Sequence, residues 1–236
     1  MKIAACFSGQ LRFFEKSYSF FKDNLLSRFS VDVFIHTWYD PALENKHFEY
    51  SHSKKPQGAY SIQDIDRCIL LYAPKAIMID QPITFKPHNK GSRENNACSM
   101  FYSVHMSNLL KKKNESISQQ KYDWVLRLRF DWAYTSFINL SLLNSDYVYI
   151  PDRDKTTTNP NHMHLNDQFA IGSSANMDVY SDAFLFTSNV SSQGNEDILY
   201  EILTSKNIVT KDMNWTHCFP PNDLLGMSSF NSLFRE

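Results

Sequence analysis

Cysteine is scarce in this sequence, and no two cysteines lie close together. Cys6, Cys68, Cys98 and Cys218 form no C-x-x-C pair among the 236 residues. Zinc ribbons and disulfide frameworks need closely spaced or numerous cysteines. We therefore expect reduced thiols, and neither a structural zinc site nor a disulfide scaffold.

Glycine is also rare, with 6 residues, and no G-x-x-x-x-G-K-[ST] pattern follows the first apolar segment. That pattern forms the phosphate loop of P-loop enzymes, so this class is not expected. An excess of one charge is lacking too, because 24 basic residues face 25 acidic ones for a formal net charge of −1. Without a global field we expect no nucleic-acid partner, and any anion site has to be local.

Long hydrophobic runs are absent as well. No stretch approaches the length needed to cross a bilayer, and the apolar run from Ile3 to Phe7 is too short for a signal peptide. We expect a cytoplasmic protein without a transmembrane segment. Peripheral association with a membrane is compatible with this expectation.

Among the features that are present, the stretch from Tyr122 to Asp131 is typical of a β-strand that ends in charge. Its even-numbered positions from 124 to 130 are apolar, and Arg127, Arg129 and Asp131 lie toward its C-terminal end. Such charges are costly inside a fold unless they are paired. In an open α/β sheet, ligands bind at the C-terminal ends of the strands.

Strand and helix patterns alternate along the first third of the chain. Strands are predicted at 2–7, 31–38 and 75–80, and helices at 14–28 and 61–72. This order requires crossover connections and hence parallel strands. We predict an α/β fold with a mostly parallel central sheet flanked by helices, formed as one domain because 236 residues can bury one large core.

Small residues followed by a cation come directly after the first strand. Ser8, Gly9, Gln10 and Arg12 would let backbone N–H groups and a guanidinium approach phosphate oxygens. An ordinary strand-to-helix turn with a solvated arginine is the alternative. His36 and Thr37 lie near the C-terminal end of the second predicted strand. A histidine at such a place is either structural or part of a ligand-binding site.

Three further features have competing interpretations. A helix over 97–113 ends in Lys111-Lys112-Lys113, which we interpret as a solvated helix end because basic residues suit that end of the helix dipole. His162 and His164 lie in a polar loop where solvation is favoured over metal binding. Acidic residues at 196 and 197 open a predicted helix and suit its dipole.

Four segments in this order resemble one known family. They are the run from Ser8 to Arg12, the strand end Val33 to Trp38, the pattern Tyr-Asp-x-Val-x-Arg-x-Arg-x-Asp over 122–131, and the run from Asn166 to Gly172. Together they resemble small GT-A glycosyltransferases, in particular those of bacterial surface-polysaccharide clusters and of large DNA viruses. The resemblance spans about residues 2–205.

The resemblance implies a Rossmann-like GT-A fold in one compact domain. A nucleotide-sugar-binding half would cover about residues 1–131 and an acceptor-binding half about residues 132–236. The donor would be a UDP-, GDP- or dTDP-linked sugar, and the acceptor a glycan or a lipid-linked glycan in polysaccharide biosynthesis. The candidate donor-binding residues are Ser8, Gly9, Gln10, Arg12, His36, Thr37, Arg127 and Arg129.

The family usually holds a divalent cation, Mn²⁺ or Mg²⁺, with an Asp-x-Asp motif at a strand end. Here the matching segment is Arg129-Phe130-Asp131, which has only the second acid. Asp131 is the candidate metal ligand, and His217 from the C-terminal segment is a second one. The alternatives are a structural arginine–aspartate pair and a structural histidine.

An inverting transfer needs a general base for the acceptor hydroxyl. Asp167, Glu196 and Asp197 are the candidate catalytic residues, and the sequence does not choose among them. A non-catalytic nucleotide-sugar-binding module and a sugar nucleotidyltransferase are the alternative functions.

Overall fold

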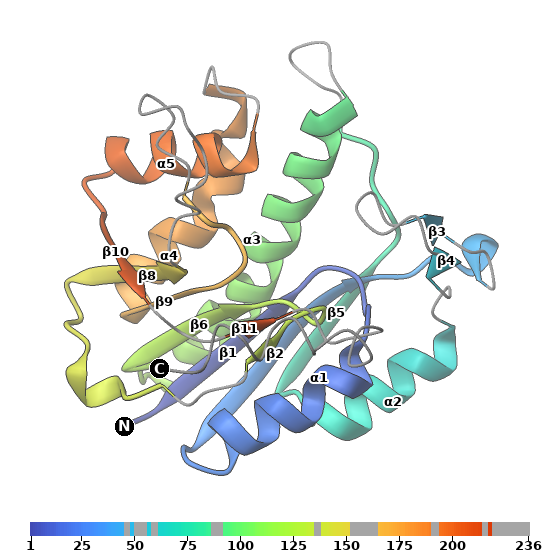
Figure 1. Cartoon of the computed structure of the whole chain (residues 1–236), viewed down its shortest axis with the longest axis horizontal. Coiled ribbons are helices and arrows are strands. Elements are labelled where there is room, and N and C mark those ends of the chain that lie inside the picture. The colour runs from blue at the N-terminus through green and yellow to red at the C-terminus, as the bar shows by residue number, and fades with distance from the viewer. Residues whose placement is uncertain are drawn as a thin grey trace, which may run out of the picture.

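One seven-stranded sheet forms the centre of the molecule (Figure 1). The computed structural model describes residues 1–44, 48–49, 56–57, 61–85, 92–134, 138–151, 165–189, 194–213 and 217–218. The strand order is β10-β8-β9-β6-β1-β2-β5. The strands are β1 (Ile3–Ser8), β2 (Val31–Trp38), β5 (Ala76–Asp80), β6 (Trp124–Leu128), β8 (Tyr147–Pro151), β9 (Ala170–Gly172) and β10 (Val209–Met213). Strand β9 is antiparallel to both neighbours and all other pairs are parallel, which confirms the predicted mostly parallel α/β sheet.

Helices cover both faces of this sheet (Figure 1). Helices α1 (Phe14–Phe21) and α2 (Ile62–Tyr72) pack on one face, and α3 (Ser92–Ser118), α4 (Ser174–Ser181) and α5 (Asn195–Ser205) on the other. Because successive strand residues point to opposite faces, β1 contributes to both cores. Ala5 and Phe7 face α1 and α2, whereas Ala4 and Cys6 face α3.

Local sequence signals account for several boundaries. Strand β2 has the predicted bounds, and α2 begins after Ser61, whose N–H donates to the Asp64 carboxylate at 2.6 Å in a capping box. Helix α1 is shorter than predicted, because the chain continues as a turn of π-helix, Lys22–Leu26. Strand β6 is also shorter than the predicted 122–131, since the chain turns at Phe130 and Asp131.

Very short elements were not predicted. Strand β3 (Phe48–Glu49) pairs with β4 (Pro56–Gln57) between β2 and α2, and β7 (Ala133–Tyr134) pairs with β11 (His217–Cys218) in the C-terminal segment. Two residues are too few to show a period of two. The 3₁₀ helices are η2 (Pro41–Leu43), η3 (Leu140–Leu142) and η4 (Asp182–Asn189). Within the described ranges, no helix is long and apolar enough to cross a membrane.

The lysine run corrects the prediction of a solvated helix end. Helix α3 continues past it to Ser118, and the side chain of Lys111 is fully buried. Its Nζ donates to Ser174 and Asp178 at 2.7 Å and to Glu115 at 3.1 Å. A buried ammonium needs such partners. Lys111 therefore ties α3 to α4, and only Lys113 of the run is exposed.

The chain reverses its direction of travel across the sheet between β1 and β6. From β1 it moves through α1 to β2 and through α2 to β5, and α3 then carries it back to β6 on the other side of β1. The connecting helices before this reversal, α1 and α2, lie on one face of the sheet, and α3, which makes the reversal, lies on the opposite face. Such a switch point, at the C-terminal ends of the strands, is where open α/β sheets bind ligands.

Candidate functional site

The loop after β1 reaches this switch point with a glycine in a left-handed conformation. Gly9 has φ +104°, which L side chains rarely adopt, and no described atom lies within 4 Å of the place a Cβ would take. Its N–H donates to the Ser103 hydroxyl at 2.8 Å and to the His36 carbonyl at 3.2 Å. The loop is thus held from behind, with open space above the glycine. Ser8 before it is buried.

Arg12 follows in the same turn. Its Nε donates to the Gln10 side chain at 2.8 Å, and its backbone N–H donates to the Gln10 carbonyl at 2.8 Å. Phe13, the next residue, has φ 55° and ψ 16°, a conformation that is costly for an aromatic residue. Strain of this kind persists only where the surrounding structure fixes the turn.

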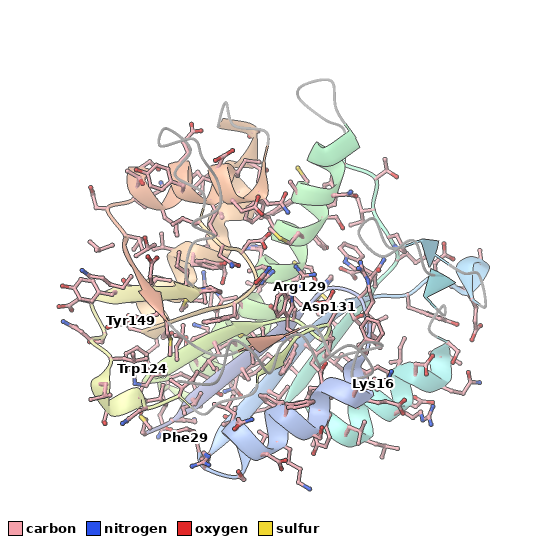
Figure 2. All side chains as sticks on the ribbon, in the orientation of Figure 1. Lys16, Phe29, Trp124, Arg129, Asp131 and Tyr149 are labelled. Atoms are coloured by element: carbon pink, nitrogen blue, oxygen red, sulfur yellow. The ribbon has the colours of Figure 1, made fainter. Side chains whose placement is uncertain are left out.

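Arg129 and Asp131 form a bidentate pair beyond the end of β6, where Figure 2 shows their side chains lying next to each other. Arg129 Nε donates to Asp131 Oδ1 and Arg129 Nη2 donates to Asp131 Oδ2, both at 2.8 Å. Arg12 Nη1 lies 3.9 Å from the same Oδ2. The structural arginine–aspartate pair that the sequence left open is therefore present.

The Asp131 carboxyl is buried, and burial alone raises the pKa of such a group. The charges of Arg129, Arg12 and Arg127, together with the hydrogen bonds from Arg129, outweigh burial and hold its pKa below the usual value. Asp131 is therefore an anion at neutral pH, surrounded by guanidinium groups.

His36 lies behind the Gly9 loop in a closed hydrogen-bond network. Its Nε2 lies 3.2 Å from Asp80 Oδ2, which also accepts the Tyr102 hydroxyl at 2.9 Å. Since a carboxylate only accepts, Nε2 carries the proton and Nδ1 accepts from Ser103 Oγ at 2.7 Å. Burial lowers the pKa of His36, although Asp80 opposes the shift, so the ring is neutral.

Thr37, the neighbouring candidate, is fully buried, and its hydroxyl has no hydrogen-bond partner among the described residues. The side chains of His36 and Thr37 therefore lie inside the fold. Their roles toward a donor stay predictions.

Arg127 connects the switch point to the second half of the chain. It is buried on the face of α3, α4 and α5, where its Nη1 donates to the backbone carbonyl of Asp167. Its Nε has no partner within the described parts of the chain. The Asp167 carboxylate accepts from Asn195 Nδ2 at 3.3 Å. Burial raises the pKa of the adjacent Tyr180 hydroxyl to about 12, with Arg127 opposing the shift and Asp167 adding to it.

Glu196 and Asp197 occupy the first turn of α5, as their suitability for the helix dipole predicted. Asn195, directly before them, bonds Asp167, and the Glu196 carbonyl accepts the Leu165 N–H at 3.3 Å. The start of α5 is thus fixed to the segment that carries Asp167. All three candidate bases come from this one region of the fold.

The sequence-predicted residues consequently form two groups. Arg12, Arg129 and Asp131 meet at the switch point, and Arg127 joins Asp167 near the start of α5. Ser103 and Asp80 were not predicted from the sequence, and their partner His36 lies 67 and 44 residues away. Tyr180 was not predicted either, and it lies near Arg127 and Asp167 only in the folded chain. The polar end of β5 was a usable signal for Asp80; Ser103, within a helix, gave none.

The contacts of the candidate metal ligands decide how well these residues could hold a divalent cation. The described part of the chain holds no group of three or more histidine, cysteine, aspartate or glutamate side chains placed to bind a metal. Both Asp131 oxygens accept from Arg129, and Arg129 itself stands where the Asp-x-Asp motif has its first acid. These residues fit a divalent cation poorly. His217 pairs through its backbone with Tyr134, but its side chain is outside the described residues, as are His162 and His164.

Comparison with known proteins gives many structural likenesses, of which one is a capsid-modifying enzyme. The fold is similar to that of a glycosyltransferase involved in the glycosylation of the major capsid of PBCV-1, over 90% of this chain and 83% of the other, with a TM-score of 0.41 and 10% identity. No family model matches the sequence, and no curated protein matches it either.

Proposed function

We propose that this protein is a glycosyltransferase that moves a sugar from a nucleotide donor to a glycan or lipid-linked acceptor. The observation that carries the proposal is the meeting of Arg12 with the Arg129–Asp131 pair at the β1–β6 switch point. The donor would be UDP-, GDP- or dTDP-linked, within the GT-A family that the sequence motifs resemble. Guanidinium groups at this edge suit its diphosphate.

The chemistry requires charge stabilisation and proton removal. The acceptor oxygen bonds to the anomeric carbon, and the carbon–oxygen bond to the β-phosphate breaks with its electron pair leaving on the diphosphate. Preorganised cations stabilise that growing charge. In an inverting reaction the acceptor proton passes to a base, for which Asp167, Glu196 and Asp197 are the candidates.

The two groups of residues support a division of the chain. Residues 1–131 supply the donor side, and the region after residue 132 supplies the acceptor side around Asp167. Arg127 connects the two sides, because it bonds the Asp167 carbonyl and also lowers the pKa of Asp131. A role for Mn²⁺ or Mg²⁺ stays a prediction, which the side chains available as metal ligands support poorly, so we derive no step through a metal.

One observation favours a second function. Because both Asp131 oxygens are engaged by Arg129, the site also suits a module that binds a nucleotide-sugar without turning it over. A sugar nucleotidyltransferase is the third alternative, and no contact described above favours it.

A donor panel separates these functions. The protein is incubated with UDP-, GDP- and dTDP-sugars, and binding is measured by calorimetry while free nucleoside diphosphate is measured by chromatography. Binding together with release of the diphosphate supports a transferase. Binding without release supports the module, and no binding of any donor overturns the proposal.

A further inference from the structure

Arg12, Arg129 and Asp131 form a cluster at the switch point, in which the Asp131 carboxylate lies deeper than the two guanidinium groups. The Asp131 side chain is 8% exposed, against 24% for Arg129 and 31% for Arg12. A ligand arriving at this edge of the sheet therefore meets guanidinium groups before it meets the carboxylate.

The two parallel hydrogen bonds from Arg129 to Asp131, here called the fork, orient one edge of the Arg129 guanidinium. The fork uses Nε and Nη2, which are two of the five N–H donors of an arginine. A planar guanidinium can hold a carboxylate on one edge and phosphate oxygens on another. Through these two hydrogen bonds Asp131 fixes the plane of the Arg129 guanidinium.

A divalent cation at the same place would meet strong opposition. It would have to displace Arg129 from Asp131 while Arg12 lies 3.9 Å from Oδ2 and Arg127 adds further positive charge. Like charges at such distances repel strongly away from bulk water. The cluster has the sign that suits an anion, and the open space above Gly9 lets one approach the loop after β1.

We propose that this site binds the diphosphate of its nucleotide ligand through Arg12 and Arg129 without a divalent cation, with Asp131 as the residue that positions Arg129. The inference rests on the proposed nucleotide-binding function and deepens it. The two guanidinium groups would take the part that a metal on an Asp-x-Asp motif plays elsewhere, namely neutralising the diphosphate before and during departure.

The test is calorimetric titration of the full chain with UDP, GDP and dTDP, once with EDTA and once with Mn²⁺. The expected result is one nucleotide that binds with the same affinity, within about twofold, in both conditions. Arg129→Gln and, independently, Arg12→Gln should each weaken its binding about 10- to 100-fold. Arg12→Gln leaves the fork intact, so it tests the inference even if Arg129→Gln does not fold.

Arg67→Gln is the matched control, since Arg67 lies on α2 and pairs with Glu15 at 3.2 Å, away from the switch point. It should bind like the wild type. Asp131→Asn should weaken binding in EDTA and in Mn²⁺ by the same factor.

Two results overturn the inference. Binding that disappears in EDTA, returns with Mn²⁺ and loses its Mn²⁺ response in Asp131→Asn makes Asp131 a metal ligand, and leaves the proposed function standing. Failure of all three nucleotides in both conditions removes the proposed function and the inference together.

Discussion

The hydroxyl of Ser103 accepts the N–H of Gly9 at 2.8 Å, so the middle of α3 holds the loop that follows β1. The same hydroxyl lies 2.7 Å from His36 Nδ1, and His36 in turn contacts Asp80. Three strands and one helix thus converge behind a single glycine. The shape of the candidate donor loop depends on this network.

Ser103→Ala should destabilise the protein and disturb the loop. It leaves the buried His36 Nδ1 without its donor and removes an acceptor from Gly9, at a cost of about 1–3 kcal/mol. Urea unfolding measures the loss. Ser107→Ala is the control, because the buried Ser107 hydroxyl donates only to its own helix, at Val104. An equal loss in both variants would contradict a special role for Ser103.

Lys111→Met should destabilise the folded protein far more than the position of Lys111 in a lysine run indicates. It leaves Glu115 and Asp178 without their shared ammonium, and breaking a buried pair costs about 3–5 kcal/mol. Lys113→Met, on the exposed face, should change the free energy of unfolding by about 0.5 kcal/mol or less. Similar midpoints of denaturation for the two variants would contradict the account of Lys111.

The lysine run shows where prediction from sequence ends. Composition and period were sufficient for β2 and for the order of strands and helices, since these signals are local. The burial of Lys111 was not predictable, because its partners Ser174 and Asp178 come from a helix more than 60 residues away. The Arg129–Asp131 pair, in contrast, joins neighbours in the sequence, and the sequence already offered it as one of two alternatives.

The candidate site was predicted in part. The sequence placed Arg12, Arg129 and Asp131 at the ends of strands, and the parallel sheet brings them together. It did not predict that Arg127, two residues before Arg129, would bond the Asp167 carbonyl on the face of the sheet that α3, α4 and α5 cover. Which partner a buried arginine takes depends on the packing of α4 and α5, which no local pattern records.

Acidification should lower the stability of the folded protein through protonation of His36. Burial lowers its pKa in the folded state from 6.5, so the unfolded chain binds a proton that the folded chain does not. The stability that neutral His36 contributes is complete above about pH 6.5 and is lost as the pH falls through the folded-state pKa. Urea midpoints at pH 7.5, 6.5 and 5.5 should fall more for the wild type than for His36→Gln; parallel curves would contradict this assignment.

Three single variants identify the base. Asp167 is buried and bonded by Asn195, whereas Glu196 and Asp197 lie in the first turn of α5, where the dipole explains them. We therefore expect Asp167→Asn to lower the transfer rate about 10²- to 10⁴-fold with donor affinity retained. Glu196→Gln and Asp197→Asn should cost far less. A large loss of rate in either of these, with Asp167→Asn active, would move the base to α5.

The most direct test of the central claim is a crystal structure with the nucleoside diphosphate that binds best. The account predicts diphosphate oxygens at the β1–β6 switch point, about 2.7–3.2 Å from guanidinium nitrogens of Arg12 and Arg129. A nucleotide bound elsewhere on the molecule, with both arginines more than a hydrogen bond away from its phosphates, would contradict it.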